Sequence, residues 1–556
     1  MTDLSYVRTE MLPEQTPPIT EKGLIKWARE NLFSNIPNTI LTLLAIYFIY
    51  TLLAGILPWV FQSSWTATSL NACRESIAHT YGEGVEGACW AVIRERYLQL
   101  LFGFYPSELY WRPVLAFALM LVAVAPVLYN GLPRKMLWFS GLYPFLAFWL
   151  FWGGTVWLPL SVIAGFVIAY LAMTLLPKVI GSLGAVIAAI LLPVIWWLML
   201  AGPAVDMLDR ISAGPLTQSY ITSTEADIAY YQTQLDSGTL TPGEATNADN
   251  LKNSAIRNLE NARNLDELKA DVVQLKTDAE AMRAALPDSV RGSASLDDVA
   301  GGVTGADKAA LEAVLDAEAN YENGKSGLQN VYAEVGRIGF TPVESAQFGG
   351  FMLSIVIGVT GIVLSLPLGI LLALGRQSDL LIVKSICVGF IEFIRGVPLI
   401  TLLFVASTLL NYFLPPGTTF DIILRVMIMV TLFSAAYMAE VVRGGLAALP
   451  TGQYEAADAL GLDYWKSMRL IIMPQALKIS IPSIVGIFIG LFKDTVLVSI
   501  IGLMDPLGLS NAIRADANWN GIVWELYGFI ALMFFIVCFS MGRYAMYLER
   551  KLQTGH

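Results

Sequence analysis

Long apolar stretches recur along the chain, and they constrain its fold more than any other feature. A membrane-spanning helix needs about 20 mostly apolar residues. We identify ten such stretches among the 556 residues, which predicts an all-α polytopic membrane protein with about ten transmembrane helices. The stretches are residues 36–61, 113–130, 137–155, 157–176, 180–201, 349–375, 385–413, 422–442, 479–501 and 522–543.

The composition agrees with a membrane protein and excludes two other classes. Hydrophobic residues make up 55% of the chain and charged residues only 14%, whereas soluble proteins carry about 25% charged residues. The net charge of −10 excludes a nucleic-acid-binding surface, which needs an excess of cations. Four cysteines in the whole chain are too few for a disulfide-stapled scaffold.

One polar segment, residues 202–348, interrupts the apolar pattern. It holds 23 acidic and 11 basic residues, while the rest of the chain has 22 acidic and 24 basic residues. Apolar side chains recur in it at alternating spacings of three and four residues, and a second helical stretch follows at 307–321. This spacing is typical of a helix that packs against another helix. The recurring residues are Leu265, Leu268, Val272, Leu275, Ala279, Met282 and Leu286. We expect a small helical hairpin or bundle; the alternative is a solvated acidic spacer.

The basic residues of the short loops predict the orientation. Lys and Arg are enriched in short cytoplasmic loops, and in a ten-span arrangement these residues fall on one side. They are Lys22, Lys26, Arg29, Arg134, Lys135, Lys178, Arg376, Lys384, Arg543, Arg550, Lys551 and those of the loop 443–478. Both termini are therefore expected in the cytoplasm and the acidic insertion outside it. Loop 62–112 is also placed outside, although it contains four arginines; its length weakens the rule there.

Two further features belong to the N-terminal part of the chain. Cys73 and Cys89 lie in the outer loop, where an oxidising compartment favours a disulfide; two unpaired thiols are the alternative. Residues 22–33 place apolar side chains on one helical face and charged ones on the other. Within a cytoplasmic N-terminus of residues 1–35, they form either a helix in the membrane interface or an ordinary lead-in to the first span.

The loop between the eighth and ninth predicted spans, residues 443–478, carries the most informative pattern. Tyr454–Leu460 reads as a short helix, and Gly461 can adopt the positive φ that ends it. Asp463 is a suitable N-cap for a second helix that contains Tyr464 and Trp465. A cytoplasmic helix–turn–helix with exposed apolar side chains needs a protein partner to cover them.

Glu455-Ala456-Ala457 is followed by Gly461 after three residues, by Ile471 after nine more, and by Met473-Pro474 one residue later. This pattern resembles the EAA signature of ABC importer permeases. Leu-Pro is the usual final pair, so Met473 is a departure. Phe393–Leu399, Ala435–Gly445 and Phe492–Leu497 look like the polar amino-acid permeases of the histidine, glutamate and glutamine type. Leu101–Pro106 looks like the subgroup of general L-amino-acid permeases, a less specific match.

The resemblance implies an architecture and a set of partners. Residues 349–556 would form a five-helix permease core, preceded by an extra five-helix half at 36–201. The chain would work in the bacterial inner membrane with a second homologous permease subunit, as a heterodimer, with two ATP-binding subunits and with a periplasmic amino-acid-binding protein. The residues expected to couple to the ATPase are Glu455, Ala456, Ala457, Gly461, Asp463, Ile471 and Pro474.

The sequence contains no ATP-binding motif that could supply the free energy for transport. Gly324-Lys325-Ser326 comes closest to a Walker A loop, but Ala319 stands where its first glycine is required. ATP and Mg²⁺ are therefore expected on the partner ATPase, and this chain is expected to bind no cofactor. Energy would enter through the loop, where Glu455 offers a charge to an ATPase cation and Ala456 and Ala457 permit close approach.

Ionisable residues inside membrane segments are costly and therefore point to function. Lys493 could bind the carboxylate of an amino acid and Asp494 its ammonium group; pairing between helices is the alternative. For Glu440, a local salt bridge to Arg443 three residues later is the simpler interpretation, and Arg395 near the inner interface can extend toward water. The candidate substrate path comprises Lys493, Asp494, Thr495, Glu440 and Arg395.

Neither a catalytic constellation nor metal-ligand spacing is visible, since the only histidines are His79 and His556, and we predict that the chain is not an enzyme. Two other functions remain to be weighed. A secondary transporter or channel would use the intramembrane charges and need no motif loop. A membrane receptor would need a cytoplasmic output domain, which the sequence does not contain. The permease of an ATP-driven amino-acid importer fits best.

Overall fold

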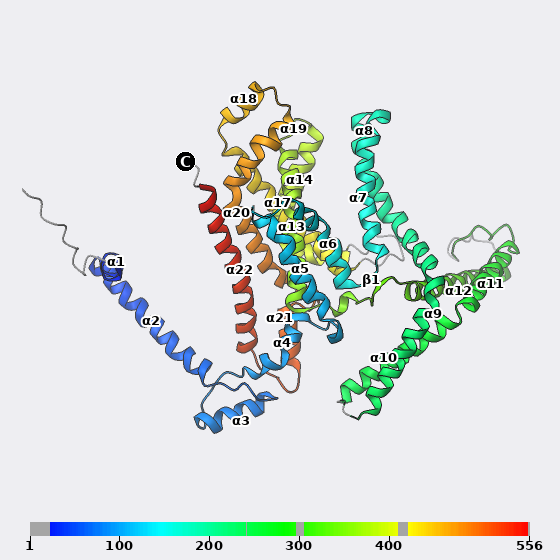
Figure 1. The fold of residues 1–556 in the computed structure, drawn as a ribbon, viewed down its shortest axis with the longest axis horizontal. Helices are drawn as coiled ribbons and strands as arrows, with labels where there is room; N and C mark the ends of the chain where they lie inside the picture. Colours follow the sequence, from blue (N-terminus) through cyan, green and yellow to red (C-terminus); the bar gives the residue numbers. More distant parts are fainter. Residues whose placement is uncertain are drawn as a thin grey trace, which may run out of the picture. The chain divides into compact units, whose positions relative to one another are not determined.

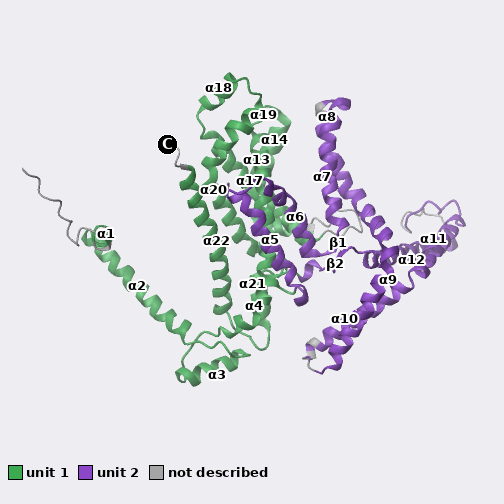
Figure 2. Ribbon diagram, viewed as in Figure 1, with its two compact units in different colours: residues 1–104, 348–556 green, residues 105–347 purple. Residues whose placement is uncertain are grey.

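The computed structural model describes residues 23–129, 131–238, 240, 242–295, 305–409 and 421–553, and these are almost entirely helical (Figure 1). Their only strands are two of two residues each, so the predicted all-α class is confirmed. Contacts divide the chain into two compact units (Figure 2). One comprises residues 1–104 and 348–556, and the other comprises residues 105–347.

Within the described residues, eight helices are long and apolar enough to cross a membrane, or nine if one bent pair counts as a span. Of the ten predicted stretches, 137–155 is the one absent from this count, because helix α6 (Leu137–Trp152) has only 16 residues. The turn η3 (Arg134–Met136) runs directly into α6, so the 19 residues together are about 30 Å long, close to the thickness of the hydrocarbon core.

The first unit contains the C-terminal helices and the first four helices of the chain. The N-terminal ones are α1 (Gly23–Asn31), α2 (Ile36–Phe61), α3 (Leu70–Tyr81) and α4 (Ala91–Phe102). The C-terminal ones are α13 (Gly350–Arg376), α14 (Leu381–Gly396), α15 (Leu399–Phe404), η7 (Val405–Leu409), α17 (Ile422–Ala447), α18 (Thr451–Ala459), α19 (Tyr464–Ser467), η8 (Met468–Ile472), α20 (Met473–Asp494), η9 (Thr495–Ile501), α21 (Pro506–Ala515) and α22 (Trp524–Gln553).

Helices α13 and α17 pack together, α20 packs on both, and α22 packs on α20. Small residues permit this approach: a Cβ on Gly369 of α13 would lie 2.6 Å from the Cβ of Met438 on α17. The predicted span 385–413 is broken, because Pro398 lacks an N–H and the following helix turns away from α14 by 104°. Its end, residues 410–413, lies outside the described residues.

At the end of α20 and α22 opposite α18 and α19 (Figure 1), the chain forms what we call the disulfide cap, residues 62–104 with 503–526. A disulfide joins Cys73 of α3 to Cys89, the pair considered from the sequence. The Cys89 amide donates to the buried Glu525 carboxylate at 2.8 Å. The fully buried Trp519 lies in the same apolar core as both cysteines.

The second unit contains the remaining membrane helices and the acidic insertion. Its elements are η2 (Ser107–Leu109), α5 (Trp111–Leu128), η3 (Arg134–Met136), α6, β1 (Gly154–Thr155), α7 (Trp157–Leu175), α8 (Pro177–Ile195), η4 (Trp196–Leu200), α9 (Ala201–Asp236), α10 (Pro242–Arg263), α11 (Leu265–Ala284), α12 (Gly305–Val335), β2 (Gly339–Phe340) and η6 (Ser345–Gln347). Strand β1 pairs antiparallel with β2, Gly154 opposite Phe340.

The insertion folds into helices with buried contacts, which favours a bundle over a solvated spacer. Helix α11 packs on α12, and a Cβ on Gly324 would lie 3.0 Å from the side chain of Leu275 on the predicted seam. Leu265, Ala279 and Leu286 of that seam are buried. A single helical run, Gly184–Asp236, passes through the predicted domain boundary at 201/202. The predicted domain boundaries themselves stay predictions.

Candidate functional site

The loop 443–478 folds into two short helices joined by a tight turn. Gly461 follows α18 with φ +69°, a conformation that residues with a Cβ rarely adopt. Asp463 caps α19, because its carboxylate accepts from the Lys466 amide at 2.9 Å. This hydrogen bond and the Lys466 ammonium lower the pKa of Asp463. The turn and the cap are local features, so the sequence alone was sufficient to predict them.

The predicted coupling residues divide between the surface and the interior. Glu455, Ala456, Gly461, Asp463 and Pro474 are exposed, Ile471 is half-buried, and Ala457 is fully buried. Because Ala457 faces its own chain, it allows α18 to approach its own helices and is not available for contact with a partner. The apolar side chains exposed on the loop are Leu460, Tyr464, Trp465 (68% exposed) and Leu470.

The base of this loop is firmly packed. Leu449, Met468 and Ile472 are buried in one apolar cluster with Leu446 of α17 and Ala476 of α20. The loop helices are thus rigidly joined to two helices of the core, and their exposed face points away from it.

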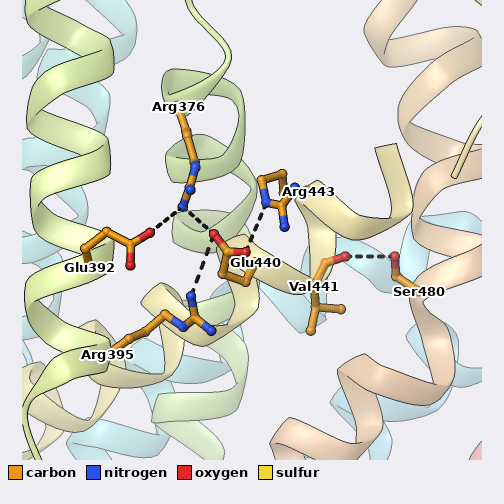
Figure 3. Close-up of polar contacts among 7 residues, drawn as sticks. All are labelled: Arg376, Glu392, Arg395, Glu440, Val441, Arg443 and Ser480. Atoms are coloured by element: carbon orange, nitrogen blue, oxygen red, sulfur yellow. Dashed lines mark hydrogen bonds and ion pairs between the residues drawn. The ribbon is translucent and has the colours of Figure 1, made fainter. Parts of the chain in front are cut away.

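Next to this cluster lies a group of five charged residues, which we call the Glu440 cluster (Figure 3). Its members are Arg376, Glu392, Arg395, Glu440 and Arg443. The carboxylate of Glu440, 16% exposed, pairs with Arg376, with Arg443 at 3.0 Å and with Arg395 at 3.9 Å. Arg376 also pairs with Glu392 at 3.1 Å. The local Glu440–Arg443 salt bridge is therefore present, within a larger network.

The other path candidates lie at the junction of α20 with η9. Lys493 is exposed and Asp494 is half-buried, and among the described residues neither side chain has a hydrogen-bond or salt-bridge partner. Thr495 is buried and donates to the Phe492 carbonyl at 2.8 Å. Ser480, beside the Glu440 cluster, precedes Lys493 by 13 residues, or about 20 Å along a helix. The five candidates thus form two separate groups.

Several buried ionisable residues were missed in the sequence, and Arg425 and Asp505 are two of them. Arg425, in the first turn of α17, donates to the carbonyls of Ser407 at 2.8 Å and Ala406 at 3.3 Å; an arginine inside an apolar run was the available signal. Asp505 is fully buried at the N-terminus of α21, and burial raises its pKa to about 6. The sequence Asp505-Pro506 is typical of a helix start. No group of three or more potential metal ligands lies among the residues described.

Comparison with known proteins identifies the family. Residues 331–554 match the family described as "Binding-protein-dependent transport system inner membrane component". The chain is 47% identical, over the full length of both proteins, to the glutamate/glutamine/aspartate/asparagine transport system permease protein BztC of Rhodobacter capsulatus. The chain belongs to the amino-acid ABC transporter permeases.

A second relative and a solved structure are also similar to this chain. The permease is 31% identical to the inner membrane amino-acid ABC transporter permease protein YhdY of Escherichia coli, over 95% of this chain and 93% of that protein. The solved structure titled "Crystal structure of an amino acid ABC transporter with histidines" is 28% identical over 36% of this chain and 91% of that chain, with a TM-score of 0.33.

Membership of this family settles several expectations. The permease is a multi-pass membrane subunit of an ABC importer and a transport component rather than an enzyme. The family implies partnership with an ATPase and a substrate-binding protein. The alternatives of a secondary transporter, a channel or a receptor are therefore set aside.

Proposed function

We propose that this permease takes its transport energy from ATPase subunits that bind α18 and α19. The observation that carries the proposal is the exposed apolar face of these helices on a firmly packed base. An apolar patch in water is a partner-binding surface, and Glu455 lies beside it as an exposed charge. The assembly would contain two ATPase subunits, which bind ATP and Mg²⁺, and a second homologous permease.

Charge reversal tests this contact. Glu455→Lys should release the ATPase when the tagged permease is purified from membranes, because a like charge at a contact repels the partner's cation. Trp465→Ser should weaken the complex as well, since it removes an exposed aromatic anchor. Lys178→Glu, in the first turn of α8, is the charge-reversal control and should leave the complex intact. An ATPase that stays bound to the Glu455→Lys variant contradicts the proposal.

The proposed substrates are amino acids with acidic or amide side chains. The support is the 47% identity to a full-length relative that is named for glutamate, glutamine, aspartate and asparagine. In the reconstituted assembly, unlabelled glutamate, glutamine, aspartate and asparagine should each reduce uptake of labelled glutamate, while lysine and leucine should not. Competition by lysine as strong as that by aspartate would contradict this substrate class.

Lys493 and Asp494 are our proposed substrate contacts. Both are ionisable, lie at the end of a membrane helix, and lack an ion-pair partner among the described residues. Lys493→Ala should raise the KM for uptake by about tenfold or more, because a hydrogen bond to a charged group is worth about 1.5–3 kcal/mol. Lys478→Ala, an exposed lysine earlier in α20, is the control.

The proposed orientation places both termini and the loop 443–478 in the cytoplasm, and the insertion in the periplasm; it includes η3 and α6 as a short fifth crossing before the insertion. The basic short loops support it, and so does the disulfide in the outer loop. In this orientation the disulfide cap and α18–α19 lie on opposite sides of the membrane, which agrees with their positions at opposite ends of α20 and α22 (Figure 1).

A further inference from the structure

Three arginines from three helices share the carboxylate of Glu440. Arg376 is the last residue of α13, Arg395 lies in the last turn of α14, and Arg443 is on α17 itself. Glu392, by contrast, is 55% exposed and pairs with Arg376 alone. Removal of Glu440 would leave three guanidinium groups without their common anion, so this residue determines how the three helix ends are held together.

One of these arginines lies directly before the break in the membrane segment. Two residues separate Arg395 from Pro398, where the chain turns by 104°. The Arg395 guanidinium also lies 5.6 Å from the ring centre of Tyr437 on α17. Beyond the break, Leu402 packs with Ile394 and with Ala436 of α17. Arg425 of α17 also donates to carbonyls beyond the break. The broken helix is therefore held to α17 on both sides of the bend, and carboxylate–arginine pairs are found on the inner side.

The opposite face of α17 is held by α20. Ser480 donates its hydroxyl to the Val441 carbonyl at 3.2 Å (Figure 3). A Cβ on Gly445 would lie 2.5 Å from the Ala476 carbonyl oxygen, so the two backbones are in direct contact. The apolar cluster at the base of the loop continues up α17 through Val442 to Met438, on either side of Glu440. A displacement of α18 and α19 would thus move the segment of α17 that carries Glu440.

We propose that Glu440 is a positioning residue that transmits movement of α18–α19 to the broken helix α14–α15, and so couples ATP hydrolysis to passage of substrate. This inference rests on the proposed function, in which the ATPase binds those two helices. Glu440 acts through Arg395 and Arg376 and does not contact the substrate, because its carboxylate is already occupied by arginines. This role differs from the substrate contact that the sequence predicts for Glu440 and Arg395.

The test is the stoichiometry of transport in the complete assembly, reconstituted with its binding protein in liposomes. Glu440→Gln keeps the shape of the side chain and removes its charge. The number of substrate molecules imported per ATP hydrolysed should fall by about tenfold, while the KM for substrate stays within about twofold and ATP hydrolysis continues. Arg395→Gln should lower the same ratio, because it removes the partner of Glu440 on α14. Glu440→Asp keeps the charge and should recover most of the coupling.

The matched control is Glu392→Gln, which removes a charge from the same cluster without touching the shared carboxylate. It should leave the ratio unchanged. A raised KM with an unchanged ratio in Glu440→Gln would make Glu440 a substrate contact and overturn the proposal. Equal loss of folded complex in Glu440→Gln and Glu440→Asp would show a merely structural role and overturn it too. Failure of the proposed function is recognised separately, since it appears as an ATPase that remains bound to Glu455→Lys.

Discussion

At the scale of single residues, burial and hydrogen bonding have opposite effects on the pKa of Asp505. Its carboxylate caps α21 by accepting from the amides of Gly508 at 2.9 Å and Leu507 at 3.2 Å. Those hydrogen bonds favour the ionised form, but burial outweighs them and raises the pKa from 3.8 to about 6. Because the folded state binds the proton more tightly than the unfolded chain, protonation stabilises the fold. This contribution, about 3 kcal/mol, is fully present below about pH 4 and is lost as the pH rises through about 6.

We therefore expect Asp505→Asn to reduce the loss of stability between pH 4.5 and 7.5. Asparagine also caps helices but does not titrate. The melting temperature of the wild type in detergent, measured relative to this variant, should fall by several degrees over that range. Asp421→Asn is the control, because Asp421 caps α17 in the same way but is exposed. Parallel pH profiles for the wild type and Asp505→Asn would contradict the prediction.

At the scale of elements, the contact of α17 with α20 depends on one glycine of an adjacent pair. A Cβ on Gly445 would lie 2.1 Å from the Ser480 hydroxyl oxygen, whereas a Cβ on Gly444 would meet nothing within 4 Å. Gly445→Ala should lower the free energy of unfolding by about 1–3 kcal/mol, since the two helices must separate. Gly444→Ala should raise it by about 0.5–1 kcal/mol, because alanine favours a helix. Thermal unfolding measures both, and equal effects at the two positions would refute this packing.

What the sequence could predict at this scale depended on the range of the interactions involved. Gly461 and Asp463 act on their own neighbours, so the two loop helices were evident from spacing alone. The salt bridge of Glu440 to Arg443 was predictable for the same reason. The pairing of Glu440 with Arg376 joins residues 64 positions apart, and it exists only because α13 and α17 pack together. Hydropathy likewise located the apolar run at 137–155 but did not give the length of the helix within it.

At the scale of the whole molecule, the Glu440 cluster determines the direction of two spans. Arg376 ends α13, and Glu440 lies near the end of α17, so their ion pair requires both helices to run in the same sense across the membrane. The chain between them must then return to the other side. Helix α14 cannot supply this return, because it stays at the inner end of α13. Cys387 lies beside Gly375 there. Five residues later, Glu392 pairs with Arg376. The crossing therefore falls to the segment after the bend at Pro398.

Cysteine labelling tests this crossing. With Cys387 and Cys538 replaced by alanine, Val273→Cys reports on the insertion and Trp465→Cys on α19; both positions are more than 60% exposed. Three crossings separate them if the bent segment returns, so an impermeant maleimide added to intact spheroplasts should label Val273→Cys only. Permeabilisation should expose Trp465→Cys, unless a bound ATPase covers it, in which case stripping the ATPase with urea restores labelling. If the segment after Pro398 instead enters and exits the membrane on the same side, only two crossings separate the two cysteines. Both would then react in intact spheroplasts, which would contradict the prediction.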